Sequence, residues 1–573
     1  MNTSKLGLSI KQIIIYLLAA LFSAACASCY INGFIIGPEK ADVLLFAFKV
    51  LLFFGIFLAS HILFNYLRIK SLLSTESKLL WNRLTLTLDK KSVWIMTSVL
   101  LIAWLPYLII FYPGVSNYDT ANQINDFFNG TASMPFGFVE GQESISCFLN
   151  DHHPVFTTFI MVPFVAFGRL VGYPNFGMLL YVVFQMVLTA FSFAVMIGFL
   201  DRIKCTYVIR KVSFLFLTFM PFIPLHAICM LKDCLYAAIF VLYLVYYVSL
   251  IKDIMIGKHQ VAVFTVLSLL TVLTKKTGIY LVVICNVVLL IKLLICTKKK
   301  EEIQESSDDT LKSNTVNGLA KKQCRGIVIS ILLPIAVMWL IFPLIIYPAF
   351  NIFSGGKQEL LGTCFQQTAK VIVDCGEDAL RSEELESIEK VISLSDINDI
   401  YYIGCTDAVK ATYNLHATSE EVSDYLKTWI RVGLRHPIKY LEATLSVCGG
   451  FFSPKKVIDI FDAIPVTEPD GVFSEFSNPG MLNGLRKVAS SAYYYCTQTP
   501  GVDILLYIFP YVWLIPLVVF VSSKKGSVGL SLMPIWISIL ILVVCPICYA
   551  RYAISQIYAV PLILGIGLTK NND

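Results

Sequence analysis

Windows of about 20 apolar residues recur along this chain, and no other feature constrains its fold as strongly. Each window is long enough to cross a hydrocarbon core of about 30 Å as a helix, the form in which a backbone in lipid satisfies its own hydrogen bonds. Of the 573 residues, 57% are hydrophobic and 15% are charged. The sequence therefore predicts an all-α polytopic membrane protein. About twelve windows qualify, near residues 12–32, 43–66, 94–112, 177–200, 212–230, 235–251, 260–274, 279–297, 326–349, 503–521, 528–548 and 553–569.

One further window, residues 154–171, is equally apolar, and the charges of the loops decide whether it crosses. Lys5 and Lys11 place the N-terminus inside, because positive charge accumulates in cytoplasmic loops. If the window crossed, the basic loops 201–211 and 298–325 would fall outside. We therefore expect it to stay at the outer interface or to re-enter, with both termini of the chain in the cytoplasm.

Four regions follow from this topology. They are a two-span extension with its cytoplasmic loop (1–92), a transmembrane core with an external loop at 113–176 (93–350), an extracytoplasmic domain (351–502) and the closing spans (503–573). In the third region, Thr418 and Glu421 form the capping-box pattern that opens a long helix, which we expect to run to Leu445.

Polar clusters that are far apart in the sequence emerge on the same external side in this topology. They lie at residues 116–126, 150–154, 231–233, 274–278 and 550–552, together with the domain 351–502. This convergence predicts a functional site on the extracytoplasmic side of a cell membrane.

The first cluster reads SNYDTANQIND and predicts a short amphipathic helix just outside the bilayer. On a helical wheel Asp119, Gln123 and Asp126 share one face, whereas Ala121 and Ile124 lie on the other. Two interpretations are open. The acids are solvated at an interface, or Asp119 is a general base beside a lipid-borne substrate.

The second cluster reads NDHHP and favours the start of a helix, with Asp151 or His152 as the N-cap and Pro154 as the first residue. The free N–H groups of such a terminus suit a phosphate or a carboxylate, and His153 adds a donor. An ordinary helix cap is the alternative. A zinc site with Asp119 is another, although adjacent histidines lack the i, i+4 spacing of a helical zinc motif.

The remaining clusters place cations on the side that usually lacks them. They contribute Lys232 with Asp233, Lys275 with Lys276, and Arg551 with Tyr552. An anionic ligand such as a phosphate explains this placement, whereas snorkelling to water, lipid headgroups or acids of the external domain are the alternatives. The net charge of +6 indicates no nucleic-acid partner. The sequence also lacks a P-loop and a dinucleotide fingerprint.

The order of these motifs resembles the GT-C glycosyltransferases, which include the protein O-mannosyltransferases and the lipid A aminoarabinose transferases. YDTANQ around Asp119 is similar to their first-loop acidic motif, and HHPVF from His152 is similar to their His-Pro element. LKD (231–233) resembles their second acidic site, and RYAISQIYAVP (551–561) resembles their closing spans. The resemblance runs from about Trp94 to the C-terminus.

This resemblance implies a GT-C-like fold and an inverting transfer of a sugar from a polyprenyl phosphate to an acceptor hydroxyl, with Asp119 as the base. The acceptor is a glycan, a lipid or a protein, and the enzyme contacts membrane lipids in a bacterial cell envelope. The expected substrate-binding residues are His152, His153, Asp151, Gln123, Lys232, Asp233, Lys275, Lys276, Arg551 and Tyr552. No cofactor is required by this reading, and a divalent metal stays an alternative.

Two functions of other classes are also open. A transporter or lipid flippase has intramembrane charges that line a path. A non-catalytic assembly protein presents its external domain to cell-wall partners, but this function leaves the acids and histidines of the first loop without a role.

Overall fold

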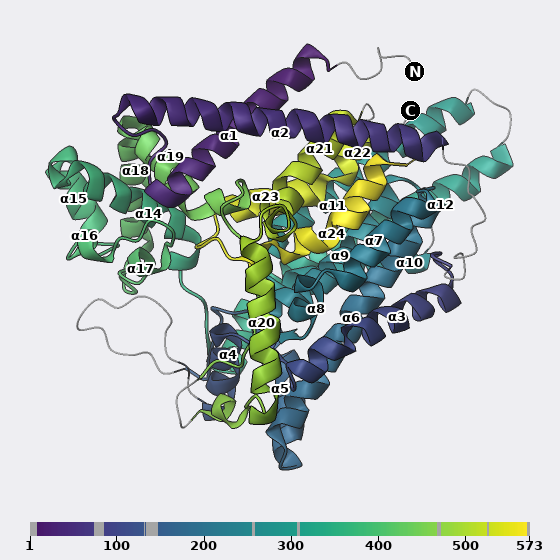
Figure 1. The fold of residues 1–573 in the computed structure, drawn as a ribbon, viewed down its shortest axis with the longest axis horizontal. Helices are drawn as coiled ribbons and strands as arrows, with labels where there is room; N and C mark the ends of the chain where they lie inside the picture. Colours follow the sequence, from purple (N-terminus) through teal and green to yellow (C-terminus); the bar gives the residue numbers. More distant parts are fainter. Residues whose placement is uncertain are drawn as a thin grey trace.

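The computed structural model describes residues 8–73, 85–130, 132, 147–254, 258–305, 310–466, 471–523 and 526–569, and nearly all of its regular structure is helical (Figure 1). This agrees with an all-α membrane protein. Lys5, on which the predicted orientation partly depends, lies outside these residues.

Within the described residues, seven helices are long and apolar enough to cross a membrane. They are α1 (Ile10–Asn32), α2 (Lys40–Leu73), α3 (Lys90–Ile110), α6 (Pro174–Arg202), α9 (Lys232–Ile251), α11 (Gly278–Glu305) and α12 (Thr310–Ala336), which continues through η2 (Val337–Ile346) and α13 (Tyr347–Ala349).

The other five predicted spans are shorter or interrupted. They correspond to α7 (Tyr207–Phe219) with α8 (Phe222–Ala227), to α10 (Lys258–Thr274), to η7 (Asp503–Leu506) with η8 (Pro510–Leu514) and α21 (Ile515–Ser522), to α22 (Gly526–Ser531) with α23 (Met533–Val543), and to α24 (Ala550–Gly567). Pro221 lies at the break between α7 and α8, where a proline cannot continue the helical hydrogen bonds. A hydropathy window averages over such breaks and does not detect them.

Burial separates the inner helices of the bundle from the outer ones. In α9, 89% of the apolar window is buried inside the protein, whereas in α2 only 11% is buried. Such a long apolar surface is stable against lipid and not against water. We therefore assign α9 to the centre of the bundle and α2 to its lipid-facing rim.

The region between the last long helix and the closing segments is also helical. Its first helices form a group at one side of the bundle, and its last helix stands apart from that group (Figure 1). It contains α14 (Gln358–Cys375), η3 (Glu377–Ala379), α15 (Ser382–Glu389), α16 (Ile397–Ile400), α17 (Asp407–Lys410), α18 (Ser419–Arg435), α19 (Pro437–Cys448), η4 (Gly449–Phe451), η5 (Val472–Glu475), η6 (Gly480–Leu482) and α20 (Asn483–Gln498). Its separate hydrophobic core lies within residues 361–440. The residues from Leu445 onward contribute to the core of the bundle.

The predicted capping box is confirmed, but the predicted long helix is two helices. The hydroxyl of Thr418 accepts a hydrogen bond from the N–H of Glu421, and the carboxylate of Glu421 accepts one from the N–H of Thr418. The helix ends at Arg435 because Pro437 disfavours helical backbone at His436 and then starts α19.

Two pairs of short parallel strands fix the polar loops. β1 (Val115–Ser116) pairs with β3 (Cys229–Met230), and β2 (Leu149–Asn150) pairs with β4 (Ile352–Phe353). The amphipathic helix α4 (Tyr118–Asn129) follows β1, and α5 (Val155–Leu170) follows β2. The first pair therefore brings α4 to the start of α9, and the second brings the His-Pro loop to the entrance of the domain that follows β4.

Candidate functional site

Asp119 lies in the first turn of α4, and the preceding residues determine its position. Gly114 has a φ of +135°, and a Cβ there would lie 3.0 Å from the carbonyl oxygen of Ile228, so this close approach requires glycine. The hydroxyl of Thr120 then donates to the carbonyl oxygen of Met230 at 2.6 Å. These contacts hold the first turn of α4 against the start of α9.

Two cations from separate elements bind the carboxylate of Asp119. Lys232, the first residue of α9, and Arg551, in the first turn of α24, both donate to Oδ2, with Arg551 Nη1 at 2.8 Å. The side chains of Asp119, Lys232 and Arg551 are 19%, 13% and 9% exposed. Burial raises the pKa of Asp119, but these two charges outweigh it and hold the pKa well below its usual range. Asp119 is therefore ionised at neutral pH.

His153 lies within electrostatic reach of the same three groups. Burial and the charge of Lys232 lower the pKa of His153 well below its usual value. Its ring packs against that of His152, with centroids 4.4 Å apart. His153 is consequently a neutral imidazole at pH 7, able to donate or accept a hydrogen bond but carrying no charge.

A second carboxylate pairs with a third cation beside this group. Lys275 Nζ lies 3.4 Å from Asp233 Oδ1, and Arg551 interacts electrostatically with Asp233 as well as with Asp119. In the part of the chain that the structure describes, Asp233 Oδ2 and Arg551 Nε are buried without a hydrogen-bond partner. We call Asp119, Lys232, Asp233, Lys275 and Arg551 the charge cluster.

Aromatic rings cover the cations of the charge cluster. Lys275 Nζ lies 5.1 Å from the ring centroid of Tyr236 and 5.4 Å from that of Tyr552. The guanidinium of Arg551 lies 5.0 Å from the Tyr552 ring and donates to the Tyr552 hydroxyl at 3.3 Å. The charge cluster holds one more cation than carboxylates, in a partly dry setting that strengthens its attraction for an anion.

Asp151 and Lys276 form a separate pair. Lys276 Nζ lies 2.7 Å from Asp151 Oδ2, which also accepts from the hydroxyl of Tyr347 at the end of the long helix before the external domain. Gly355 lies against the same pair, since a Cβ on it would be 3.1 Å from Lys276 Nζ. Adjacent lysines thus serve different carboxylates, and Asp151 connects the His-Pro loop to the domain entrance.

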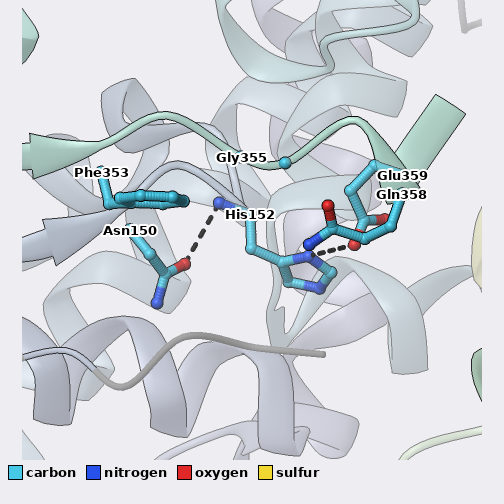
Figure 2. A pocket seen from close by; sticks show the side chains of 7 residues that line it. Asn150, His152, Phe353, Gly355, Gln358 and Glu359 are labelled. Carbon is cyan, nitrogen blue, oxygen red and sulfur yellow. Dashed lines mark hydrogen bonds and ion pairs between the residues drawn. The ribbon is translucent and has the colours of Figure 1, made fainter. Parts of the chain in front are cut away.

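The ring of His152 points toward Glu359, at the entrance of the domain that follows β4, as Figure 2 shows. Its Nδ1 lies 3.1 Å from Glu359 Oε1, and its N–H donates to Asn150 Oδ1 at 3.1 Å. Lys410 donates to the other oxygen of Glu359 at 3.0 Å. Burial raises the pKa of Glu359, but the bonds from His152 and Lys410 outweigh it and lower this pKa to about 2. This contact holds the domain and the loop together.

Gln123 contacts neither the cations nor the histidines of the site. Its amide nitrogen donates to the hydroxyls of Thr157 at 3.1 Å and Thr158 at 2.8 Å, and these bonds join α4 to α5. Its role in the structure is therefore to hold the helix that carries Asp119.

Asp126, two turns after Asp119, is a carboxylate in a different environment. It accepts one hydrogen bond, from Asn150 Nδ2 at 3.2 Å. Burial raises the pKa of Asp126 to about 6, although the bond from Asn150 opposes this shift. An acid that titrates near neutral pH in a polar loop is a candidate for function.

Asp459 contacts the start of α24, the helix that carries Arg551. Its Oδ1 accepts from the N–H of Ala550 at 3.3 Å and lies 3.4 Å from Lys456 Nζ. This bond satisfies a free N–H at the start of α24, one residue before Arg551. Asp459 therefore positions the guanidinium that binds Asp119.

The zinc alternative has no counterpart among the residues that the structure describes. No group of three His, Cys, Asp or Glu side chains there lies close enough together to hold a metal ion. Asp119 is instead paired with Lys232 and Arg551, and His152 Nδ1 lies against Glu359.

Comparison with known proteins places the chain in a family. The model of a family of unknown function, DUF6020, matches residues 4–570. The chain belongs to DUF6020. No curated protein and no solved structure matches this DUF6020 chain.

The structure divides the predicted site residues of the DUF6020 chain into two groups. Asp119, His153, Lys232, Asp233, Lys275, Arg551 and Tyr552 come together, whereas Asp151, His152 and Lys276 form the contact with the domain entrance. Sequence reasoning missed the roles of Asp126, Asn150, Glu359 and Asp459. The i, i+7 spacing from Asp119 was a signal for Asp126, while the others are joined by tertiary contacts that no local pattern indicates.

Proposed function

We propose that this chain is a membrane glycosyltransferase that transfers a sugar from a polyprenyl phosphate to an acceptor hydroxyl, with inversion, on the extracytoplasmic side of a cell membrane. The main support is the charge cluster. Its cations come from three separate elements and outnumber its carboxylates, and Arg551 Nε is a buried donor without a partner in the described part of the chain. A phosphate suits such a group of fixed, partly desolvated donors.

The orientation belongs to the same proposal. Twelve spans with cytoplasmic termini place the charge cluster outside, where no nucleoside triphosphate is at hand and a lipid-linked sugar supplies its own leaving group. The shorter helices α7, α10, α21, α23 and α24 complete this count together with the seven long ones.

The ion pairs of Asp119 set the order of events. With Lys232 and Arg551 on its Oδ2, Asp119 is a weak base, because its pKa lies far below that of a solvated carboxyl. A donor phosphate takes hydrogen bonds from these two cations and so weakens their hold on Asp119. The pKa of Asp119 then rises, and the carboxylate becomes an effective base when the donor is bound.

The transfer is a single displacement. The acceptor oxygen forms a bond to the anomeric carbon, the bond from that carbon to the phosphate oxygen breaks, and the acceptor proton passes to Asp119. The electron pair of the broken bond leaves with the polyprenyl phosphate, whose charge Lys232, Lys275 and Arg551 stabilise. Neutral His153 beside Asp119 donates a hydrogen bond to donor or acceptor without adding charge.

Release of radiolabelled sugar from a panel of polyprenyl-phosphate donors tests this function. The wild type is compared with Asp119→Asn, and Asp253→Asn is the matched control because Asp253 pairs with Lys292 outside the charge cluster, at 3.1 Å. We expect release by the wild type and the control, and none by Asp119→Asn at an unchanged elution volume on size exclusion. No release from any donor, with a lysate present as acceptor source, contradicts the proposal and favours a transporter.

A further inference from the structure

A polar strip runs along the open face of α4. Asn122 and Asp126 follow Asp119 by three and seven residues, so all three lie on one side of the helix. Asp119 and Asp126 are about 10 Å apart along the helix axis, at about 1.5 Å per residue. The opposite side, with Ala121 and Ile124, is buried. The strip therefore begins at the charge cluster and leads away from it.

The carboxylate of Asp126 has fewer partners than its chemistry allows. Two carboxylate oxygens offer about four acceptor positions, and the structure gives Asp126 one hydrogen bond, from Asn150. Among the described residues no lysine or arginine forms an ion pair with it, and the residues from 113 to 153 include neither type. The neighbouring acid Glu475 is paired with Arg169 at 3.1 Å.

Burial without a cation is unfavourable for a carboxylate, so Asp126 does not stabilise the fold in its ionised form. The burial raises its pKa to about 6. An acid kept in a destabilising position is expected where it binds a ligand. The contrast with Glu475, an acid of the same region with a cation beside it, makes a purely structural role unattractive.

Asn150 holds the far end of the strip in place. Its Oδ1 accepts from the N–H of His152, so its Nδ2 is directed at Asp126, and β2 is paired with β4 behind it. The Phe127 ring packs on Phe148, with centroids 5.4 Å apart. The carboxylate–amide pair thus stands on well-packed elements, which preorganises it.

The strip presents one type of chemistry. A hydroxyl donates to a carboxylate and accepts from an amide, and the side chain of Asn122 between the two acids is exposed. The ionised carboxylates repel an anionic acceptor, and the side chains of the strip, Asp119, Asn122 and Asp126, are all polar. A neutral molecule with several hydroxyls matches these properties.

We propose that Asn122, Asp126 and Asn150 form the subsite for a neutral saccharide acceptor, whose reacting hydroxyl lies at Asp119. The identity of this ligand as an acceptor rests on the proposed transferase function. The binding of a saccharide along α4 stands on the geometry of the strip.

Saturation-transfer NMR with methyl glycosides tests the subsite directly. The full chain is placed in lipid nanodiscs, because glycoside detergents carry the very headgroups under test. We expect saturation transfer to at least one glycoside with the wild type and with the control Glu475→Gln, whose side chain pairs with Arg169. We expect Asp126→Asn to reduce binding at least tenfold. Equal binding by wild type and Asp126→Asn, or no binding of any glycoside, overturns the proposal. Saturation transfer to serine peptides and to no glycoside overturns it as well.

A second readout separates loss of binding from loss of folding. Asp126→Asn replaces a destabilising carboxylate with a neutral amide of the same shape, so its thermal unfolding temperature should equal or exceed that of the wild type. A clear decrease overturns the proposal, because it assigns Asp126 a structural role. Glycoside binding without sugar release supports the saccharide subsite and contradicts the transferase function. Sugar release without glycoside binding supports the transferase function and contradicts the subsite.

Discussion

Asp119 and Asp126 are the same residue type on the same face of one helix, yet their surroundings give them opposite properties. Asp119 is bound by Lys232 and Arg551, which hold its pKa well below the usual range after burial has raised it. Asp126 has one amide partner, and burial raises its pKa to about 6. Carboxylates whose environments push their pKa values apart take different roles in a site.

The two carboxylates therefore make opposite contributions to the stability of the fold. Asp119 contributes to the fold because removing it leaves two buried cations unpaired. In the proposed mechanism, a donor phosphate draws those cations away. Asp126 costs stability and gains a role only through a ligand.

Asp119→Asn should reduce sugar transfer by roughly 100- to 10,000-fold, the range that general-base catalysis supplies. It should also destabilise the fold by about 3 to 5 kcal/mol, because Lys232 and Arg551 lose their shared partner. Sugar release and thermal unfolding of the same preparation measure both effects. An Asp119→Asn protein as stable as the wild type contradicts the assignment of the two cations to this carboxylate.

Arg551→Gln should raise the KM for the polyprenyl-phosphate donor about 10- to 100-fold, because a hydrogen bond to a charged group contributes about 1.5 to 3 kcal/mol. The matched control is Arg435→Gln, which breaks the pair between Arg435 and Glu384 in the external domain. An unchanged donor KM in Arg551→Gln, at a reduced kcat, points to a role in positioning Asp119 alone.

Saccharide binding at the far end of α4 should weaken as the pH falls through about 6, because protonated Asp126 loses acceptor capacity. Other titratable groups around α4 are Cys147, which feels the charge of Asp126, the Arg169–Glu475 pair and His152 beside Glu359. Glycoside binding measured between pH 5 and pH 7 (about one unit either side of the transition) by the NMR assay reports the midpoint. Binding that does not change in Asp126→Asn over this range identifies Asp126 as the group.

Asp126→Asn should raise the free energy of unfolding at pH 8 and have little effect at acidic pH. The folded pKa of Asp126 is raised to about 6, above its value of about 4 in the unfolded chain. Its favourable contribution is therefore complete below about pH 4 and is lost as the pH rises through about 6. Unfolding temperatures of wild type and variant across this range should diverge with rising pH by a few degrees.

Glu359→Gln should have the smallest effect, a loss of about 1 kcal/mol or less, because Glu359 is partly exposed and Lys410 keeps Asp407 as a partner. The pKa of Glu359 is lowered to about 2 in the fold, so its contribution is present above about pH 4.5 and is lost as the pH falls through about 2. Hydrogen exchange of α14 against that of α18 shows whether the contact at the domain entrance loosens. Faster exchange in both helices indicates a loss of global stability instead.

The sequence predicted which polar clusters lie together better than it predicted their individual contacts. Loop charges placed five distant polar clusters on one side, and the structure brings Asp119, Lys232, Asp233, Lys275 and Arg551 together. The pairing of adjacent lysines with different carboxylates was not predictable, because both lie in one turn. Only the packing of α10 against α9 and α5 decides which acid each lysine meets. Asp151 and His152 were expected at the substrate and contact the domain entrance instead.

Helix boundaries show the same division. The capping box at Thr418 was predictable because its hydrogen bonds are local. The predicted helix ran on to Leu445, whereas the helix in the structure ends at Arg435 because of Pro437. The break at Pro221 was missed for the same reason. The predicted external domain is divided, because α19 and the segments after it bury apolar residues in the bundle while residues 361–440 keep a core of their own.

By itself the sequence determined that this DUF6020 chain is a helical membrane protein, because hydropathy and backbone hydrogen bonding in lipid act over a single segment. It also determined that α4 is amphipathic, since that property depends only on helical periodicity. Tertiary structure alone decided that Asp119 is held by two cations and that Asp126 pairs with none in the part of the chain that the structure describes. The reason is that a carboxyl pKa depends on charges and desolvation within a few ångströms, and those neighbours come from helices hundreds of residues away.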